Sequence, residues 1–152
     1  MQLLRQAIAL AVESAGTDGG PFGAVVARGD EVIALGTNRV TSSGDPTAHA
    51  EIVAIRRACE ALGTHDLSGC TLYASTEPCP MCLAATWWAR IDEIVFAADR
   101  HAAARAGFDD AAIYKEVASE RDVRSIPCRQ RLAEEGEAPF AAWAANPARR
   151  PY

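Results

Sequence analysis

Apolar residues in the first part of the chain change their spacing near Gly16. Before that glycine they recur every three or four positions, which predicts an amphipathic helix; they are Leu3, Leu4, Ala7, Ile8 and Ala11. After a glycine-rich break at 16–20, apolar runs at 22–27 and 32–35 flank the turn-forming pair Gly29-Asp30. Two such runs joined by a tight turn predict a β-hairpin.

From residue 50 onward, helical and strand patterns alternate, which implies parallel strands with crossover helices. The expected elements are a helix ending at Gly63, a strand at 70–75, a helix at 81–88, a strand at 94–98 and a short helix at 102–106. Residues 126–132 are predicted to form a fifth strand at a sheet edge, because Pro127 lacks an N–H for a central ladder. The pattern thus predicts one α/β domain, residues 1–152: a three-layer α/β/α sandwich around a mixed five-stranded sheet, with a C-terminal tail at 137–152.

Composition narrows the setting of this domain. A length of 152 residues suits one domain with a real core. The net charge of −5 disfavours nucleic acid as a partner, since polynucleotide binders gather Lys and Arg on one face. Five cysteines, an odd number, favour a reducing compartment over a disulfide framework. The apolar run at 7–12 is shorter than a signal segment, so a cytoplasmic protein with no membrane segment is expected.

Two separated motifs carry the candidate chemistry. His49 and Glu51 form H-x-E, and Cys79 and Cys82 form P-C-x-x-C; this pairing is the known signature of zinc-dependent deaminases. Zinc prefers a tetrahedral shell of nitrogen and sulfur, and a catalytic site uses three protein ligands and leaves the fourth position to water. His49, Cys79 and Cys82 supply that number, so one Zn²⁺ per chain is predicted.

The spacing of these residues constrains where the metal can lie. The two cysteines, three positions apart, share one side of a first helical turn. His49 and Glu51 are two apart and would diverge on the body of a helix, so they can meet one metal only beyond a helix end. Asp45-Pro46 and Glu77-Pro78 are accordingly predicted to start the two helices, each with an acidic cap before a first-turn proline.

Glu51 is predicted to carry protons rather than to bind the metal. Zinc lowers the pKa of bound water from ~15.7 to about 7, and a carboxylate beside that water can pass its proton to a substrate. The alternative is a structural zinc site, in which a fourth ligand closes the shell. Cys59, Cys70 and Cys128 have no partner at ligand spacing, so the sequence favours a catalytic site and a core position for Cys59.

The order of hairpin, His-Ala-Glu helix, strand and Pro-Cys-Pro-Met-Cys helix resembles the cytidine deaminase superfamily, and within it the short bacterial guanine deaminases. The similarity runs nearly end to end, and beyond the metal motifs it includes residues 19–25 and the Gly-Phe-Asp-Asp segment at 107–110. It implies hydrolysis of guanine to xanthine and ammonia. Glu51 would move a proton to a ring nitrogen and later to the departing amine, while backbone N–H groups near Ala50 and Cys79 steady the tetrahedral centre.

The same resemblance implies roles for further residues. Asn38 and Asp110 would hydrogen-bond the purine ring, and Phe22 and Trp88 would wall the pocket. It also implies a homodimer whose C-terminal tail crosses to the neighbouring subunit and places Tyr152 over its active site. Plainer roles stay open: Asn38 could brace a loop, Asp110 could cap the next helix, and Trp88 could pack in the core.

Three other functions compete with this reading. A deaminase of guanosine or another aminated heterocycle would use the same zinc chemistry with different polar groups in the pocket. A tRNA adenosine deaminase needs a basic groove, which the acidic net charge disfavours. A non-catalytic zinc module would have no use for a proton carrier such as Glu51 beside the metal ligand His49.

Overall fold

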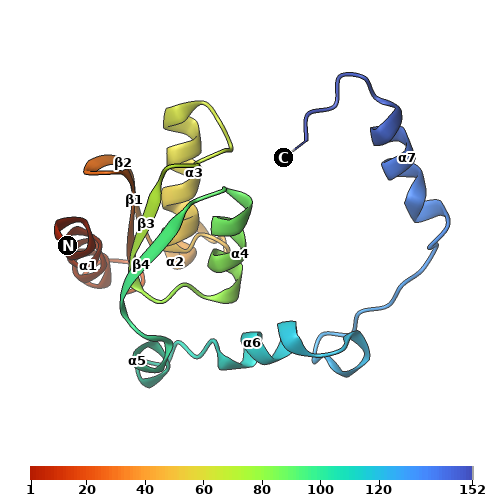
Figure 1. Cartoon of the computed structure of the whole chain (residues 1–152). Helices are drawn as coiled ribbons and strands as arrows, with labels where there is room; N and C mark the ends of the chain where they lie inside the picture. The colour runs from red at the N-terminus through yellow and green to blue at the C-terminus, as the bar shows by residue number, and fades with distance from the viewer. Residues whose placement is uncertain (152) are drawn as a thin grey trace. The chain divides into compact units, whose positions relative to one another are not determined.

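A computed structural model describes residues 1–151 and divides the chain into a first unit, residues 1–114, and a second unit from residue 115 onward (Figure 1). The elements in chain order are α1 (Gln2–Ala15), β1 (Gly23–Arg28), β2 (Glu31–Thr37), α2 (Val40–Ser43), α3 (Ala50–Leu62), β3 (Thr71–Thr76), α4 (Pro80–Trp88), β4 (Glu93–Ala98), α5 (Arg100–Arg105), α6 (Ala111–Ala118), η1 (Arg121–Val123), η2 (Glu135–Glu137) and α7 (Ala138–Ala145). The predicted tail at 137–152 falls within the second unit.

The sheet has the strand order β2-β1-β3-β4. β1 pairs antiparallel with β2, which confirms the hairpin, and antiparallel with β3 as well. β3 and β4 are parallel and joined by α4, which confirms the crossover that the alternating pattern predicted. The sheet is therefore mixed, as expected, but within residues 1–151 it has four strands and not five.

The predicted fifth strand at 126–132 is wrong. Pro127 removes a ladder donor, and Leu132 has a φ of 52°, in the left-handed region outside the β conformation. The segment lies in the second unit, whereas all four strands lie in the first. β2 and β4 are consequently the two edges of the sheet.

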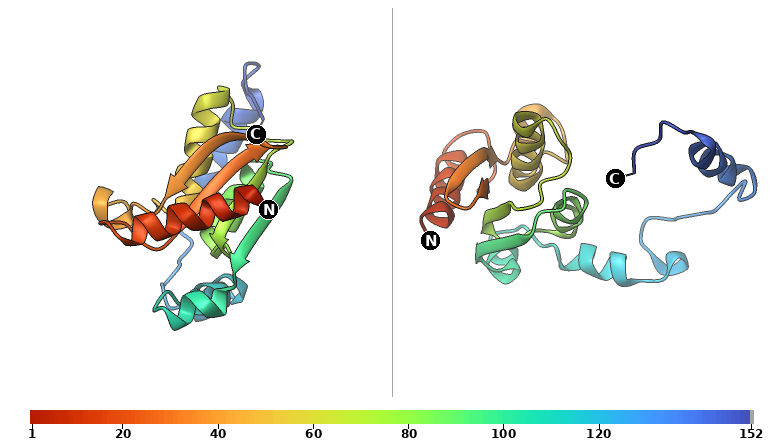
Figure 2. Two further views of the ribbon diagram at one scale, coloured as in Figure 1. Left: turned by 90° about the vertical axis from the view of Figure 1, so that its left-hand side faces the viewer. Right: turned by 45° about the horizontal axis from the view of Figure 1, so that its top comes forward.

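Helices cover both faces of the sheet. Successive β1 residues face opposite sides: Val25 and Ala27 pack with α1, while Ala24 and Val26 pack in the cluster that contains α3. Figure 2 shows α1 lying across one face, and Figure 1 shows α3 and α4 on the other. These four residues are fully buried, which makes β1 the centre of the core. Cys59 packs against the α3 side of this core, as predicted.

One glycine on β2 sets the position of α3. A Cβ atom at Gly36 would lie 2.1 Å from the carbonyl oxygen of Ala50 and 2.7 Å from the nitrogen of Ala54. Only a residue without a side chain permits so close an approach of helix and strand backbones. The first turn of α3 therefore rests directly on β2, and that turn begins next to His49.

The second unit has no core of its own. None of its described residues is buried, and its larger apolar side chains are exposed; they include Ile126, Leu132, Phe140 and Trp143. A segment of this size cannot bury enough apolar surface by itself to be stable. No helix within residues 1–151 is both long and apolar enough to span a bilayer.

We expect Gly36→Ala to lift the first turn of α3 from the sheet. The variant should lose about 1–3 kcal/mol of unfolding free energy, the usual cost of overpacking, and should also bind zinc more weakly because His49 moves with the helix. Gly136→Ala is the matched control, since a Cβ at Gly136 would meet nothing within 4 Å. Thermal unfolding and metal analysis report the two effects, and equal behaviour of the two variants would contradict this packing.

Candidate zinc and substrate site

Helices α3 and α4 begin at the two metal motifs. His49 is the N-cap residue of α3 and Cys79 is that of α4, and their backbones are nearly identical, with φ/ψ of −65°/156° and −64°/168°. Neither side chain caps its own helix, so each can turn toward a ligand instead. Glu51 and Cys82 follow in the first turns of the same helices. The sequence analysis predicted that the two motifs come together just beyond two helix ends, and this prediction is confirmed.

The predicted helix starts at Asp45-Pro46 and Glu77-Pro78 are wrong. α3 begins at Ala50 and α4 at Pro80, so it is the second proline of the Cys motif that takes the first helical position. Neither acid caps the helix that follows it. Each pairs with an arginine instead, and the two acid–proline pairs form braced loops that lead to the metal ligands.

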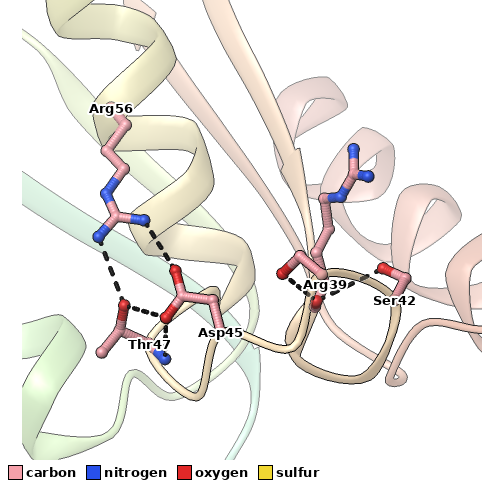
Figure 3. A network of polar contacts seen from close by, with 6 residues as sticks. Arg39, Ser42, Asp45, Thr47 and Arg56 are labelled. Atoms are coloured by element: carbon pink, nitrogen blue, oxygen red, sulfur yellow. Dashed lines mark hydrogen bonds and ion pairs between the residues drawn. The ribbon is translucent and has the colours of Figure 1, made fainter.

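Asp45 holds the loop that leads to His49. Its carboxylate accepts hydrogen bonds from the backbone N–H and the hydroxyl of Thr47, at 2.8 and 2.7 Å, which forms a tight turn. Arg56 reaches back from α3 to Asp45 at 3.3 Å and to Thr47 at 3.4 Å (Figure 3). The pair is exposed and adds little stability, but it ties the loop to the helix that His49 begins.

The three predicted ligand atoms form a nearly equilateral triangle. Nδ1 of His49 lies 3.6 Å from the Sγ atoms of both Cys79 and Cys82, and the two Sγ atoms are 3.6 Å apart. Tetrahedral zinc, with bonds of about 2.3 Å to sulfur and 2.0–2.1 Å to nitrogen, places such ligands about 3.5–3.8 Å apart. The residues therefore fit zinc. Within residues 1–151, no other three His, Cys, Asp or Glu side chains gather their ligand atoms in this way.

The pKa values of the two cysteine thiols are shifted in opposite directions. The hydrogen bond between Cys79 and Cys82, together with His49, lowers the pKa of the Cys79 thiol to about 4, which favours its thiolate form. The same hydrogen bond, together with burial, raises the pKa of Cys82. Cys79 also raises the pKa of the His49 imidazole. Zinc must therefore displace protons from the site, which couples metal affinity to pH.

Glu51 is a buried carboxylate beside this triangle. It is 8% exposed and lines the same cavity as His49 and Cys79. Burial, followed by the negative charge of Cys79, raises the pKa of its carboxyl group. A carboxyl group whose pKa is raised toward neutrality can both take up and release a proton during a reaction.

The triangle opens into a cavity of ≈350 Å³, which is large enough for a small heterocycle. Glu51 and three of the predicted binding residues, Phe22, Asn38 and Asp110, line it. Phe108 also lines the cavity and meets the ring of Phe22 edge to face, with centroids 4.9 Å apart. The sequence analysis did not single out Phe108, although it lies in the Gly-Phe-Asp-Asp segment.

Hydrogen bonds around two of these residues narrow their roles. Oδ1 of Asn38 accepts from the N–H of Val40 at 3.2 Å, so Asn38 braces its loop while its amide NH₂ remains a donor beside the cavity. At the start of α6, the side chain that accepts from the N–H of Ala111 belongs to Asp109, at 2.9 Å, and not to Asp110. Asp110 is therefore left to face the cavity, and burial raises the pKa of its carboxyl group.

Three predicted residues lie elsewhere. Trp88, the last residue of α4, is 54% exposed; it belongs neither to the core nor to the lining of the cavity. Ala50 is the first residue of α3, and its contribution is a first-turn backbone N–H, which has no acceptor within the helix. Tyr152 lies outside the described residues.

Residues 1–98, which include both metal motifs, match the family described as "Cytidine and deoxycytidylate deaminase zinc-binding region". The chain belongs to this family. Its membership confirms a zinc-dependent deaminase, and His49, Cys79 and Cys82 form a possible metal site within the matched region.

Relatives within the family differ in how much of the chain they match. The guanine deaminase of Bacillus subtilis (strain 168) is 50% identical over 141 residues, which are 92% of this chain and 90% of that protein. The X-ray structure of guanine deaminase from Bacillus subtilis has a TM-score of 0.96 at 47% identity, and the alignment covers 99% of this chain and 97% of that one. A tRNA-specific adenosine deaminase of Aquifex aeolicus (strain VF5) is 45% identical over 78 residues, 51% of this chain and 52% of that protein. Similarity to the guanine deaminase thus extends into the second unit.

Proposed function

We propose that this chain hydrolyses guanine to xanthine and ammonia. The observation that carries the proposal is a single cavity that joins a three-ligand zinc site to the buried carboxylate of Glu51 and to the polar side chains of Asn38 and Asp110. The guanine deaminase of Bacillus subtilis, which is 50% identical over 92% of this chain, supports the choice of substrate. The reaction class itself follows from the family.

Proton transfer falls to Glu51. Zinc held by His49, Cys79 and Cys82 supplies a Lewis acid that lowers the pKa of water. Glu51 takes one proton from the attacking water and delivers it to a ring nitrogen; it then takes the second proton from the hydroxyl of the tetrahedral adduct and delivers it to the departing amine, which leaves as ammonia while the carbonyl of xanthine forms. Its burial keeps this proton out of bulk solvent. The first-turn N–H groups of α3 and α4 follow the cavity-lining residues His49 and Cys79, and in this proposal they stabilise developing negative charge.

Asn38 and Asp110 give the cavity one donor and one acceptor. The NH₂ group of Asn38 donates to a ring acceptor, because its oxygen is engaged by the backbone. Asp110 accepts from a ring N–H of guanine. Phe22 and Phe108 offer apolar contact to the ring. A ring that leaves these half-buried polar groups unpaired is disfavoured.

We also propose a homodimer in which the second unit of one chain covers the cavity of its partner. The exposed apolar side chains of Ile126, Leu132, Phe140 and Trp143 need a surface to pack on, since their own unit buries none of them. Exposed apolar surface of this kind is typical of an interface. A tail that closes the site would exclude water from the reaction.

The cytoplasm is the proposed setting. All five cysteines have free thiols, and two of them belong to the zinc site. A reducing compartment keeps such thiols available to the metal.

A substrate panel tests the proposed function. Zinc-loaded protein is incubated with guanine, guanosine, cytosine and a tRNA hairpin that contains adenosine, and ammonia release is measured. We expect release from guanine alone, because guanine matches both Asn38 and Asp110. Faster release from guanosine or from the hairpin would overturn the proposal.

We expect Glu51→Gln to retain zinc and to lose about 10²–10⁴-fold in turnover, the range for a general acid–base group. Glu60→Gln, on the exposed side of the same helix, is the matched control and should behave like the parent enzyme. Metal analysis and ammonia release are measured on the same samples. Parental turnover in Glu51→Gln would show that Glu51 does not carry the proton. Loss of zinc in this variant would show that Glu51 is a metal ligand.

Deletion of residues 149–152 should impair guanine turnover and leave zinc near one per chain, because the tail covers the cavity without binding the metal. Ammonia release and metal analysis again report the two quantities. Unchanged turnover would contradict a lid formed by the tail.

Mixing two inactive variants distinguishes a tail that acts on the partner from one that acts on its own chain. Glu51→Gln protein has an intact tail but lacks the carboxylate that transfers protons. The tail deletion keeps this carboxylate but lacks the residues proposed to cover the cavity. If the tail crosses between subunits, mixed dimers should recover part of the turnover. No recovery, with exchange of subunits shown by mass, would place each tail on its own chain.

A further inference from the structure

A carboxylate in the zinc loop is clamped by the first residue of α5. Glu77 lies in the loop between β3 and α4, two residues before Cys79. It accepts hydrogen bonds from the backbone N–H of Arg100 at 3.0 Å, and from Nε and Nη2 of the same residue at 3.1 and 2.5 Å. Two side-chain bonds and one backbone bond fix both the direction and the distance of this contact.

Tyr114 closes the network from α6. The guanidinium of Arg100 lies over its ring, 4.2 Å from the centroid, and its hydroxyl donates to the carbonyl of Pro78 at 3.1 Å. Its backbone N–H bonds the carbonyl oxygen of Asp110 at 3.1 Å. Asp110 is thus one helical turn away from a residue that is fastened to the zinc loop.

Neither Arg100 nor Tyr114 reaches the reacting groups. Glu77 and Asp110 line the cavity, but Arg100 and Tyr114 do not, and none of the four belongs to the metal triangle. Their contacts instead link the segment that carries Asp110 to the loop that leads to Cys79. Lysine could not replace Arg100, because its ammonium group lacks the planar guanidinium that forms two bonds to Glu77 and that stacks on the ring of Tyr114.

We propose that Arg100 and Tyr114 are positioning residues that hold Asp110 where it and Glu51 reach the same ring. The inference rests on the proposed function for the role of Asp110 as a ring acceptor. The network spans three segments that are distant in sequence, namely the zinc loop, the start of α5 and the first turn of α6. Because neither Arg100 nor Tyr114 is a metal ligand, we expect the network to act on substrate geometry while the three ligands still hold zinc.

A double-mutant cycle on the full-length, zinc-loaded enzyme tests the proposal. Arg100→Gln should raise the KM for guanine about 10-fold in the parent enzyme and less than about 2-fold when Asp110→Asn is already present, because an effect exerted through Asp110 disappears with it. Arg57→Gln is the control: the side chain of Arg57 donates to the backbone oxygen of Leu35 at 2.9 Å, away from the Glu77 network, and its loss should leave KM unchanged. Equal factors in both backgrounds, or loss of zinc from Arg100→Gln, would overturn the proposal.

A second readout needs no substrate. The N–H groups of Phe108 and Tyr114 are hydrogen-bonded, so hydrogen exchange at both should accelerate in Arg100→Gln and Tyr114→Phe but not in Arg57→Gln. Unchanged exchange would overturn the proposal. Tyr114→Phe removes only the hydroxyl and takes the place of Arg100→Gln in the cycle if the latter does not fold. If the parent enzyme released no ammonia from guanine, the proposed function would fail, and exchange would still decide this inference.

Discussion

The site depends on two helix N-termini that meet at one point. His49 and Cys79 occupy equivalent N-cap positions with almost the same extended backbone, and neither side chain bonds its own helix as an N-cap residue ordinarily does. Glu51 and Cys82 follow within a turn. The arrangement thus brings metal ligands, a carboxylate and unpaired backbone N–H groups to the same place. It also gathers the positive ends of two helix dipoles beside an anionic sulfur.

The sheet makes this meeting possible. Gly36 lets the first turn of α3 rest on the backbone of β2, and the parallel crossover from β3 to β4 carries α4 to the same side. Each ligand loop is then braced by an acid and an arginine, Asp45 with Arg56 and Glu77 with Arg100. Folding stability and zinc affinity are linked as a result, because the packing that seats α3 also places its ligand.

Short-range patterns predicted most of the first unit, because periodicity and motif spacing record local geometry. The hairpin, the crossover and the three zinc ligands all follow from such patterns. The wrong predictions arise where a contact with a residue far along the chain outweighs the local sequence pattern. Asp45 and Glu77 resemble helix caps in sequence, but their arginine partners lie 11 and 23 residues away. Trp88 follows helical spacing, yet Cys82 and Thr86 define the buried side of α4, and a residue two positions after Thr86 points away from it.

The coordination of zinc in active protein tests the central claim most directly. X-ray absorption at the zinc edge, recorded on full-length enzyme of measured activity, should give two sulfur ligands at about 2.3 Å, one histidine nitrogen at about 2.0–2.1 Å and one light atom from outside the protein. A third sulfur or a fourth protein ligand would describe a closed structural site. Either result, or full activity in protein that contains no zinc, would contradict the account.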